Sequence, residues 1–229
     1  MDLIAKKLML SRGMKILDIG CGWGSLSKYL AENYGVRVVG ITVSQEGANY
    51  ARERCSNLPV DIRLMDYRDL DEKFDRIVSV GMFEHVGPKN YPSFFDMAER
   101  CLKDDGIFLL HTIGVSHDDF PLADAFFDKY IFPNGILPYH KHITEHIDKR
   151  FVLEDWQNMG NDYSKTLISW FQNFAQNWNK IESTYGDKFF RLWKYYLLMG
   201  AGCFKARRLQ LWQVVLSKNG IDGGYYAAR

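Results

Sequence analysis

Residues 15–24 read Lys15-Ile16-Leu17-Asp18-Ile19-Gly20-Cys21-Gly22-Trp23-Gly24, an apolar run that leads into a turn with three alternating glycines and then into a helical pattern. Glycine lacks a Cβ atom, so such a turn can take positive φ and leave room for a ligand between the strand end and the next helix. A P-loop would end in Gly-Lys-Ser/Thr, and a dinucleotide-binding loop would read G-x-G-x-x-G. The stretch fits neither spacing.

An Asp directly before the first glycine, followed by G-x-G-x-G, resembles the S-adenosylmethionine (AdoMet) loop of class I methyltransferases. The resemblance implies that Asp18, Gly20, Gly22 and Gly24 contact AdoMet. The alternative is a glycine-rich turn between a strand and a helix with no ligand.

Composition narrows the class of protein. A chain of 229 residues suits a single α/β domain, and we take 1–229 as one unit. The 29 basic and 28 acidic residues nearly balance, which argues against a nucleic-acid binder. The four cysteines form no C-x-x-C pair, which favours reduced thiols and a cytoplasmic setting. No run reaches the roughly 18 apolar residues of a membrane span, so we expect a soluble or peripheral protein.

Apolar runs alternate with helical patterns in the order that predicts a doubly wound, mainly parallel sheet. Strands are predicted at 15–19, 37–41, 61–65, 75–80 and 106–112, with helices between them at 24–34, 45–55 and 91–102. The alternation lapses at 116–150, which we interpret as an insertion that covers the site. A strand at 151–155, helices at 163–179 and 186–206 and a strand at 210–217 complete the prediction.

Ligands of such sheets bind outside the carboxyl ends of the strands. The second strand ends without the acid that usually holds the ribose, but Thr42, Ser44 and Gln45 can make the same hydrogen bonds. After the third strand, Asp66 can accept from an adenine amino group and Tyr67 can lie against the ring; a solvated turn carboxylate beside a half-buried tyrosine is the alternative. The expected cofactor contacts at the end of the fourth strand are Val80 and Gly81.

Glu84 follows the fourth strand and His111 closes the fifth, and both therefore point to the same edge of the sheet. A carboxylate and an imidazole beside a methyl donor can hold a base, or an anion that serves as the base. Taken singly, Glu84 could be a helix-capping acid and His111 an ordinary hydrogen-bonded histidine.

The chain resembles the cyclopropane-fatty-acyl-phospholipid synthases and, more loosely, the mycolic acid cyclopropane synthases, from about Leu3 to Arg229. The motifs that carry the resemblance are Asp18-Ile-Gly-Cys-Gly-Trp-Gly24, Asp66-Tyr-Arg-Asp-Leu70, Arg76-Ile-Val-Ser-Val-Gly-Met-Phe-Glu-His-Val-Gly-Pro-Lys-Asn-Tyr91, Leu109-Leu-His-Thr-Ile-Gly114, Tyr130-Ile-Phe-Pro-Asn-Gly135 and Leu211-Trp-Gln-Val-Val215.

This resemblance implies a class I AdoMet-dependent methyltransferase fold, with a Rossmann-like seven-stranded sheet whose last strand is antiparallel and a helical insertion that forms an acyl pocket. It implies methylene transfer from AdoMet to a cis double bond of a phospholipid acyl chain, with bound bicarbonate as the base. Carried over by position, the bicarbonate contacts are Glu84, His111, the backbone around Ile113, and Tyr196. Two neighbouring anions need a shared proton, so we expect a raised pKa for Glu84.

The aromatic second half could supply the wall of an acyl tunnel, although helical spacing of aromatic residues more often indicates an ordinary core. A basic group could meet lipid phosphate or be a solvated helix end. His140, His142 and His146 lack a partner motif, so we expect no metal site. The aromatic residues are Phe126, Phe127, Tyr130, Phe132, Trp170, Phe171, Phe174, Trp178, Phe189, Phe190, Trp193 and Tyr195, and the basic group is Lys205, Arg207 and Arg208.

Members of the resembled family carry further sequence ahead of the point where this chain starts: a lid segment over AdoMet and, in the bacterial phospholipid enzymes, an N-terminal domain. We expect this chain to be a catalytic-domain fragment, a chain completed by a homodimer or another partner, or a protein with weakened activity. The expected partners are unsaturated phospholipids at the inner face of the membrane. The alternatives are a lipid C-methyltransferase that leaves a methyl branch, and an inactive AdoMet- or lipid-binding fragment.

Overall fold

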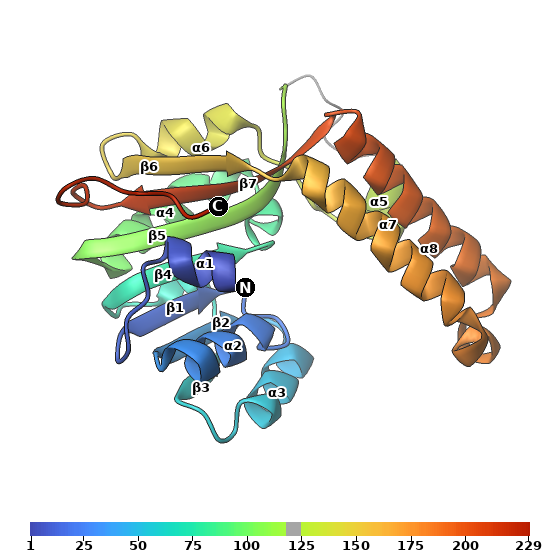
Figure 1. The fold of residues 1–229 in the computed structure, drawn as a ribbon, viewed down its shortest axis with the longest axis horizontal. Helices are drawn as coiled ribbons and strands as arrows, with labels where there is room; N and C mark the ends of the chain where they lie inside the picture. Colours follow the sequence, from blue (N-terminus) through green and yellow to red (C-terminus); the bar gives the residue numbers. More distant parts are fainter. Residues whose placement is uncertain (118–124) are drawn as a thin grey trace.

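The computed structural model describes residues 1–117 and 125–229 and is built on a seven-stranded sheet in the order β3-β2-β1-β4-β5-β7-β6 (Figure 1). Strands β1 to β5 pair in parallel, and β7 runs antiparallel to both of its neighbours, β5 and β6. The predicted doubly wound sheet with an antiparallel last strand is confirmed. The strands are β1 (Lys15–Ile19), β2 (Arg37–Thr42), β3 (Val60–Leu64), β4 (Phe74–Val80), β5 (Leu102–Val115), β6 (Val152–Asn158) and β7 (Leu209–Ser217).

Helices cover both faces of this sheet, because the central strands are apolar on both sides. On β5, Ile107 and Leu109 belong to a core with α1 (Asp2–Lys7) and α2 (Ser25–Tyr34), whereas Phe108 and Leu110 belong to a core with α4 (Tyr91–Cys101). Helix α3 (Gln45–Arg54) packs beside α2 over β2 and β3. Within residues 1–117 and 125–229, short 3-10 turns complete the connections: η1 (Tyr67–Asp69), η2 (Phe83–His85), η3 (Pro88–Asn90) and η4 (Trp178–Lys180).

The prediction of an insertion over the site at 116–150 is wrong for its second half. Helix α6 (His140–Ile147) packs against α4, and Ile143 and Ile147 are buried in the core of that face. It is therefore a crossover helix between β5 and β6. Its sequence is mostly polar and rich in histidine, and its apolar face consists of Ile143 and Ile147, one helical turn apart, which gives only a weak signal for a core helix. Helix α5 (Ala125–Tyr130) meets α8 through aromatic contacts, and residues 118–124 of the expected insertion lie outside the described residues.

The connection from β6 to β7 is a hairpin of two long helices, α7 (Gly160–Gln176) and α8 (Glu182–Lys205), that projects away from the sheet (Figure 1). The two helical stretches predicted there are confirmed. Their buried apolar residues, Leu167, Leu197, Ala201 and Phe204, form a small core of their own. Across the described residues, no helix is long and apolar enough to cross a bilayer.

Candidate active site

The glycine loop joins β1 to α2 at the carboxyl edge of the sheet. Gly20, Gly22 and Gly24 all have positive φ, of 78°, 53° and 73°. A Cβ on Gly20 would lie 2.7 Å from the Cβ of Met82, and one on Gly24 would lie 2.9 Å from the Cβ of Ala51. A Cβ on Gly22 would meet nothing within 4 Å. Two glycines thus allow close packing, and the third faces open space.

Asp18 ties the end of β1 to the first turn of α2. Its side chain is only 2% exposed, and its Oδ2 accepts a hydrogen bond of 2.6 Å from the Ser27 hydroxyl. Burial raises the pKa of Asp18 to about 6, with the bond from Ser27 acting in the opposite direction. Asp18 therefore holds the loop in place through Ser27, and direct contact with a cofactor stays a prediction.

The end of β2 carries the predicted ribose contacts. The Ser44 amide donates to Thr42 Oγ1 at 3.2 Å, and Ser44 Oγ accepts from the Gly47 amide at 3.1 Å, so Ser44 caps α3. Gln45 lies in the first turn of α3, where its Nε2 donates to Asn49 at 2.9 Å. All three predicted residues lie near the glycine loop, because the Gly20 amide donates to the Ile41 carbonyl at the end of β2.

The predicted adenine contacts follow β3. Asp66 accepts from the guanidinium and the amide of Arg68, and these bonds hold the pKa of its carboxyl below the usual value. The ring of Tyr67 meets Phe94 edge-on, with centroids 5.6 Å apart. Asp66 is therefore paired within its own turn, and Tyr67 is half-buried against α4.

Glu84 lies where β4 has ended and β5 continues. The last pair of these strands joins Val80 to His111, and Gly81, with a φ of 67°, donates its N–H to the His111 carbonyl at 3.0 Å. The next N–H of β5 that faces β4 belongs to Ile113. It donates to the Glu84 carboxyl oxygen Oε1 at 2.7 Å. The carboxyl thus takes the place that a longer β4 would occupy.

The Glu84 carboxyl is 7% exposed, and its other oxygen, Oε2, is buried with no hydrogen-bond partner among the described residues. Burial raises its pKa, and the bond from the Ile113 amide opposes that rise. Burial alone therefore raises the pKa of Glu84, and the further rise that we expect from a neighbouring bicarbonate stays a prediction.

His111 lies on β5 two residues before Ile113, so both side chains lie on the same face of the strand. Its Nδ1 is 3.2 Å from the side-chain nitrogen of Gln213 on β7. Burial, and then the positive charge of Lys7, lower the pKa of His111 to about 4, which keeps the ring neutral at pH 7. The described contacts join Glu84 and His111 through β5 and not directly.

Tyr196 reaches the same strand from α8. It packs in the core of the helical hairpin with Ile113 and with Trp193, whose ring centroid is 5.1 Å away. Burial raises the pKa of the Tyr196 phenol to about 12. Glu84 therefore bonds to Ile113, and Tyr196 packs against the same apolar core as Ile113.

Three aromatic residues near this edge were missed by the sequence prediction. Tyr163 of α7 packs in the same core as Ile113 and Tyr196, and its pKa is raised by burial and by the charge of Glu84. Tyr91 is fully buried behind Glu84. Trp23, within the glycine loop, is 58% exposed. Trp23 and Tyr91 lie within motifs that carry the family resemblance, and this was the only sequence feature that could have pointed to them. Tyr163 lies in no such motif, and only its helical spacing could have indicated a role.

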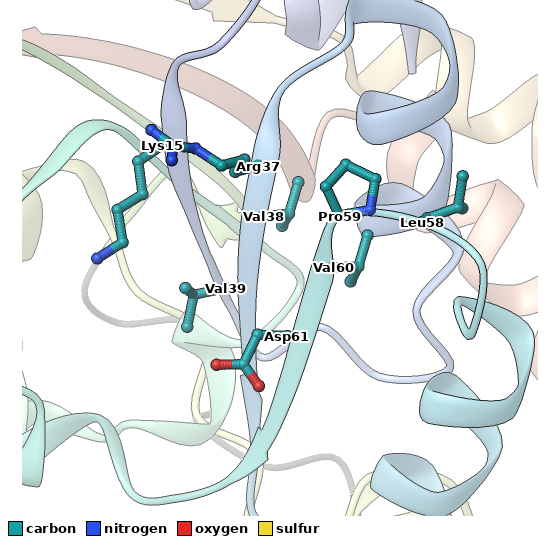
Figure 2. Close-up of a pocket in the computed structure, with 8 residues that line it drawn as sticks. All are labelled: Lys15, Arg37, Val38, Val39, Leu58, Pro59, Val60 and Asp61. Carbon is teal, nitrogen blue, oxygen red and sulfur yellow. The ribbon is translucent and has the colours of Figure 1, made fainter.

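Figure 2 shows a pocket at the opposite edge of the sheet, where β1, β2 and β3 begin. It lies away from the glycine loop and from Glu84, so it takes no part in the site. The described residues hold no group of three or more His, Cys, Asp or Glu side chains that could bind a metal ion. The pocket is lined by Lys15, Arg37, Val38, Val39, Leu58, Pro59, Val60 and Asp61.

Comparison with known proteins gives a consistent family. The profile described as "Mycolic acid cyclopropane synthetase" matches residues 1–214. The chain is 52% identical, over its whole length, to the cyclopropane-fatty-acyl-phospholipid synthase of Escherichia coli K12, and spans 59% of that protein. It is 31% identical to the sphingolipid C9-methyltransferase of Komagataella phaffii, with 94% of this chain and 48% of that protein aligned.

Solved structures agree with this match. The cyclopropane synthase MmaA2 of Mycobacterium tuberculosis superimposes with a TM-score of 0.87 at 29% identity, covering 95% of this chain and 82% of that one. The mycolic acid cyclopropane synthase CmaA1, in a complex with SAH and CTAB, gives a TM-score of 0.86 at 32% identity, with the same coverage. The chain belongs to the mycolic acid cyclopropane synthetase family and has the fold of class I AdoMet-dependent methyltransferases.

Proposed function

We propose that the chain transfers a methylene group from AdoMet to the cis double bond of unsaturated acyl chains in membrane phospholipids and closes a cyclopropane ring. The observation that carries this proposal is the buried Glu84 carboxyl, bound at 2.7 Å to the Ile113 amide of the strand that also carries His111, with Tyr196 packed against the same core as Ile113. These are the groups that can hold a base next to the glycine loop. The 52% identity to a protein named for this product supports the choice of reaction.

The glycine loop fits AdoMet. Gly22 and Gly81 both have positive φ, and a Cβ on either would meet nothing within 4 Å, so the backbone at the ends of β1 and β4 is open to a ligand. Thr42 and Ser44 lie at the end of β2, the other neighbour of β1, and offer hydroxyl groups. When bound, AdoMet supplies a methyl group on a sulfonium, which is electrophilic enough for an alkene to attack.

Bicarbonate fits the groups around Ile113. His111 lies on β5 two residues before Ile113, and Tyr196 packs against the same apolar core as Ile113. Glu84, His111 and Tyr196 would hold the anion, which supplies a base for the proton of the newly added methyl group, whereas the Ile113 amide already donates to Glu84 Oε1 and does not fit the contact expected of it. Because burial raises the pKa of Glu84, a neutral carboxyl would not repel the anion, and the anion's own O–H can donate to Glu84 Oε1.

The residues of the chain have two further tasks in this reaction. Attack by an alkene leaves a positive charge on the acyl chain, so the site must exclude water that would capture it. Phe127, Phe132 and Trp193 surround Tyr196, with ring centroids 5.1–5.9 Å from it, and give the site an apolar wall on the side of the helical hairpin. Their faces also stabilise a nearby cation.

A second candidate is transfer of a methyl group that remains as a branch. The similarity to the sphingolipid C9-methyltransferase favours it, at 31% identity. A base beside the new methyl group favours ring closure, since loss of a proton from that methyl group is what closes the ring. The two products have the same mass and differ in structure.

Two measurements test the proposal. Isothermal titration with AdoMet shows whether the chain binds the donor. Mass analysis of lipids after incubation with AdoMet and vesicles of an unsaturated phospholipid should show a gain of one CH₂ per modified acyl chain. Resistance of that product to mild hydrogenation indicates a ring, and uptake of hydrogen indicates a branched alkene. AdoMet binding without any change in lipid mass would support a binding fragment and contradict the proposal.

A further inference from the structure

Glu84 and two side chains behind it each carry a buried polar atom with no hydrogen-bond partner among the described residues. These atoms are Glu84 Oε2, the Tyr91 hydroxyl and His146 Nδ1. They come from three different elements, η2, α4 and α6. Buried polar atoms in folded proteins are nearly always partnered, because an unpaired one loses its hydration without compensation. Three such atoms around one aromatic cluster therefore need an explanation.

Tyr91 lies directly behind the segment that carries Glu84. Its side chain is fully buried, and its ring stacks on that of Phe83, the residue before Glu84, with centroids 4.4 Å apart and planes 18° apart. Burial and the charge of Glu84 both raise the pKa of the Tyr91 phenol, so the hydroxyl is within electrostatic range of the carboxyl and keeps its proton. A phenol that keeps its proton can both donate and accept a hydrogen bond.

His146 continues this group toward the surface. Its ring meets Tyr91 edge-on, with centroids 5.9 Å apart, and also lies 6.1 Å from the ring of Phe95. Unlike Glu84 and Tyr91, His146 is only half-buried, so its ring reaches solvent beside α6. The three residues thus run from the candidate site, through the apolar core under α4, to the outside of the protein.

The hydrogen-bonding capacities of the three groups match in one direction. A neutral carboxyl has one O–H to donate, a phenol accepts one bond and donates one, and a neutral imidazole nitrogen accepts one. None of the three atoms bonds directly to another in the structure, so bridging waters would have to link them in that order, and all three would then be satisfied.

We propose that Glu84, Tyr91 and His146 form a buried hydrogen-bonded relay that orients the Glu84 carboxyl and carries the proton of the reaction from the site to the surface. This inference rests on the proposed function, since ring closure must dispose of one proton in a site that excludes water. The C–H bond of the added methyl group breaks and its electron pair forms the last C–C bond of the ring. As Glu84 takes up a proton at the site, it passes one to the Tyr91 oxygen, Tyr91 passes its own to His146 Nδ1, and the ring of His146 releases one to solvent.

The test begins with Tyr91→Phe, which keeps the ring and removes only the hydroxyl. Tyr225→Phe is the matched control, because the Tyr225 hydroxyl donates to the Lys7 carbonyl at 2.9 Å, on the α1 side of the sheet. Loss of one buried hydrogen bond should lower the melting temperature by about 2–4 °C in either variant. Only Tyr91→Phe should also lower kcat, by about tenfold, with the KM for AdoMet within about twofold of the wild type, as for a group in a proton-transfer path.

Non-additivity separates a relay from three independent residues. In a Glu84→Gln background, Tyr91→Phe should cause no further loss of kcat and a smaller loss of melting temperature. His146→Phe, which keeps a ring at that position, should lower kcat as much as Tyr91→Phe does, and the double variant should be no worse. A melting temperature for Tyr91→Phe at or above that of the wild type, with kcat unchanged, would show an unpaired hydroxyl and overturn the relay, as would additive losses.

The failure of the relay and the failure of the proposed function give different results. Active wild-type protein with additive variants contradicts the relay alone. Inactive wild-type protein contradicts the proposed function, and the coupling between Tyr91 and Glu84 then still appears, or fails to appear, in the melting temperatures.

Discussion

Replacing the loop glycines one at a time with alanine should separate folding from cofactor binding. Gly20 has a φ of 78°, and an added Cβ would lie 2.7 Å from both Cβ and Cγ of Met82. The positive φ alone costs about 1–2 kcal/mol for a residue with a side chain. Forcing an atom into a packed contact costs about 1–3 kcal/mol more. Gly20→Ala should therefore lose about 2–5 kcal/mol of unfolding free energy.

Gly22→Ala is the informative partner. Its φ of 53° carries the backbone penalty, but its Cβ would meet no atom within 4 Å, so the fold should lose only about 1–2 kcal/mol. The new methyl group would stand in the open space where AdoMet is expected. Affinity for AdoMet should fall by about tenfold or more, roughly 1.4 kcal/mol of binding energy. Gly13→Ala is the control, because it has a positive φ of 87° and an open Cβ position away from the loop.

The assay is thermal melting combined with calorimetric titration of AdoMet. For a domain of this size, about 1 kcal/mol moves the melting temperature by about 2–4 °C. Gly20→Ala should melt well below the other two variants, and Gly22→Ala should melt with Gly13→Ala but bind AdoMet more weakly. Equal melting of all three variants, or wild-type affinity in Gly22→Ala, would refute this interpretation of the loop.

Three further predictions concern buried charges. Glu84→Gln should lower kcat by about 10²-fold or more with little change in melting temperature, whereas Glu84→Ala should also destabilise the fold by about 1–3 kcal/mol because it leaves the Ile113 amide unpaired; paired kinetics and melting check both. Folding raises the pKa of Asp18 to about 6, so its contribution to the free energy of unfolding is complete below pH 4 and is lost as the pH rises through 6, a change of about 3 kcal/mol. Denaturant titrations between pH 4 and 7 should show this fall in stability for the wild type, and Asp18→Asn should remove it. Lys7 is fully buried against Asp155 at 3.2 Å, so Asp155→Asn should cost about 3–5 kcal/mol in chemical denaturation, and equal stability of the variant would contradict a buried ion pair.

The strands could be predicted from the sequence because their apolar runs face cores on both sides. Ile107 and Leu109 fill one core and Phe108 and Leu110 the other, which gives an unbroken apolar run. The start of β5 was predicted at 106 but is Leu102, since residues 103–105 are Lys and Asp, and polar residues at a strand end give no hydrophobic signal.

The site was predictable at the level of strand ends and not of contacts. Parallel topology brings the ends of β1, β4 and β5 to one edge, and the structure places Gly20 after β1, Glu84 after β4 and His111 near the end of β5. The Ile113 amide is free to bond Glu84 because β4 stops pairing with β5 at Val80 and His111, before it reaches Ile113. No residue pattern in the sequence indicates where that pairing stops.

Tyr196 shows a second limit of sequence reasoning. It comes from a helical hairpin inserted between β6 and β7, and only the family resemblance distinguished it from the neighbouring Tyr195. The structure separates the two clearly: Tyr195 is 49% exposed, while Tyr196 packs in the core with Ile113.

The most direct test of the account follows one carbon atom. The purified chain is incubated with AdoMet carrying a ¹³C-labelled methyl group and with vesicles of a cis-monounsaturated phospholipid, and the extracted lipid is examined by ¹³C NMR. The label should appear as the CH₂ of a cyclopropane ring, and Glu84→Gln should slow the appearance of that signal by about 10²-fold. Label in a methyl branch, or undiminished ring signal in Glu84→Gln, would contradict the central claim that the carboxyl at the end of β4 serves ring closure.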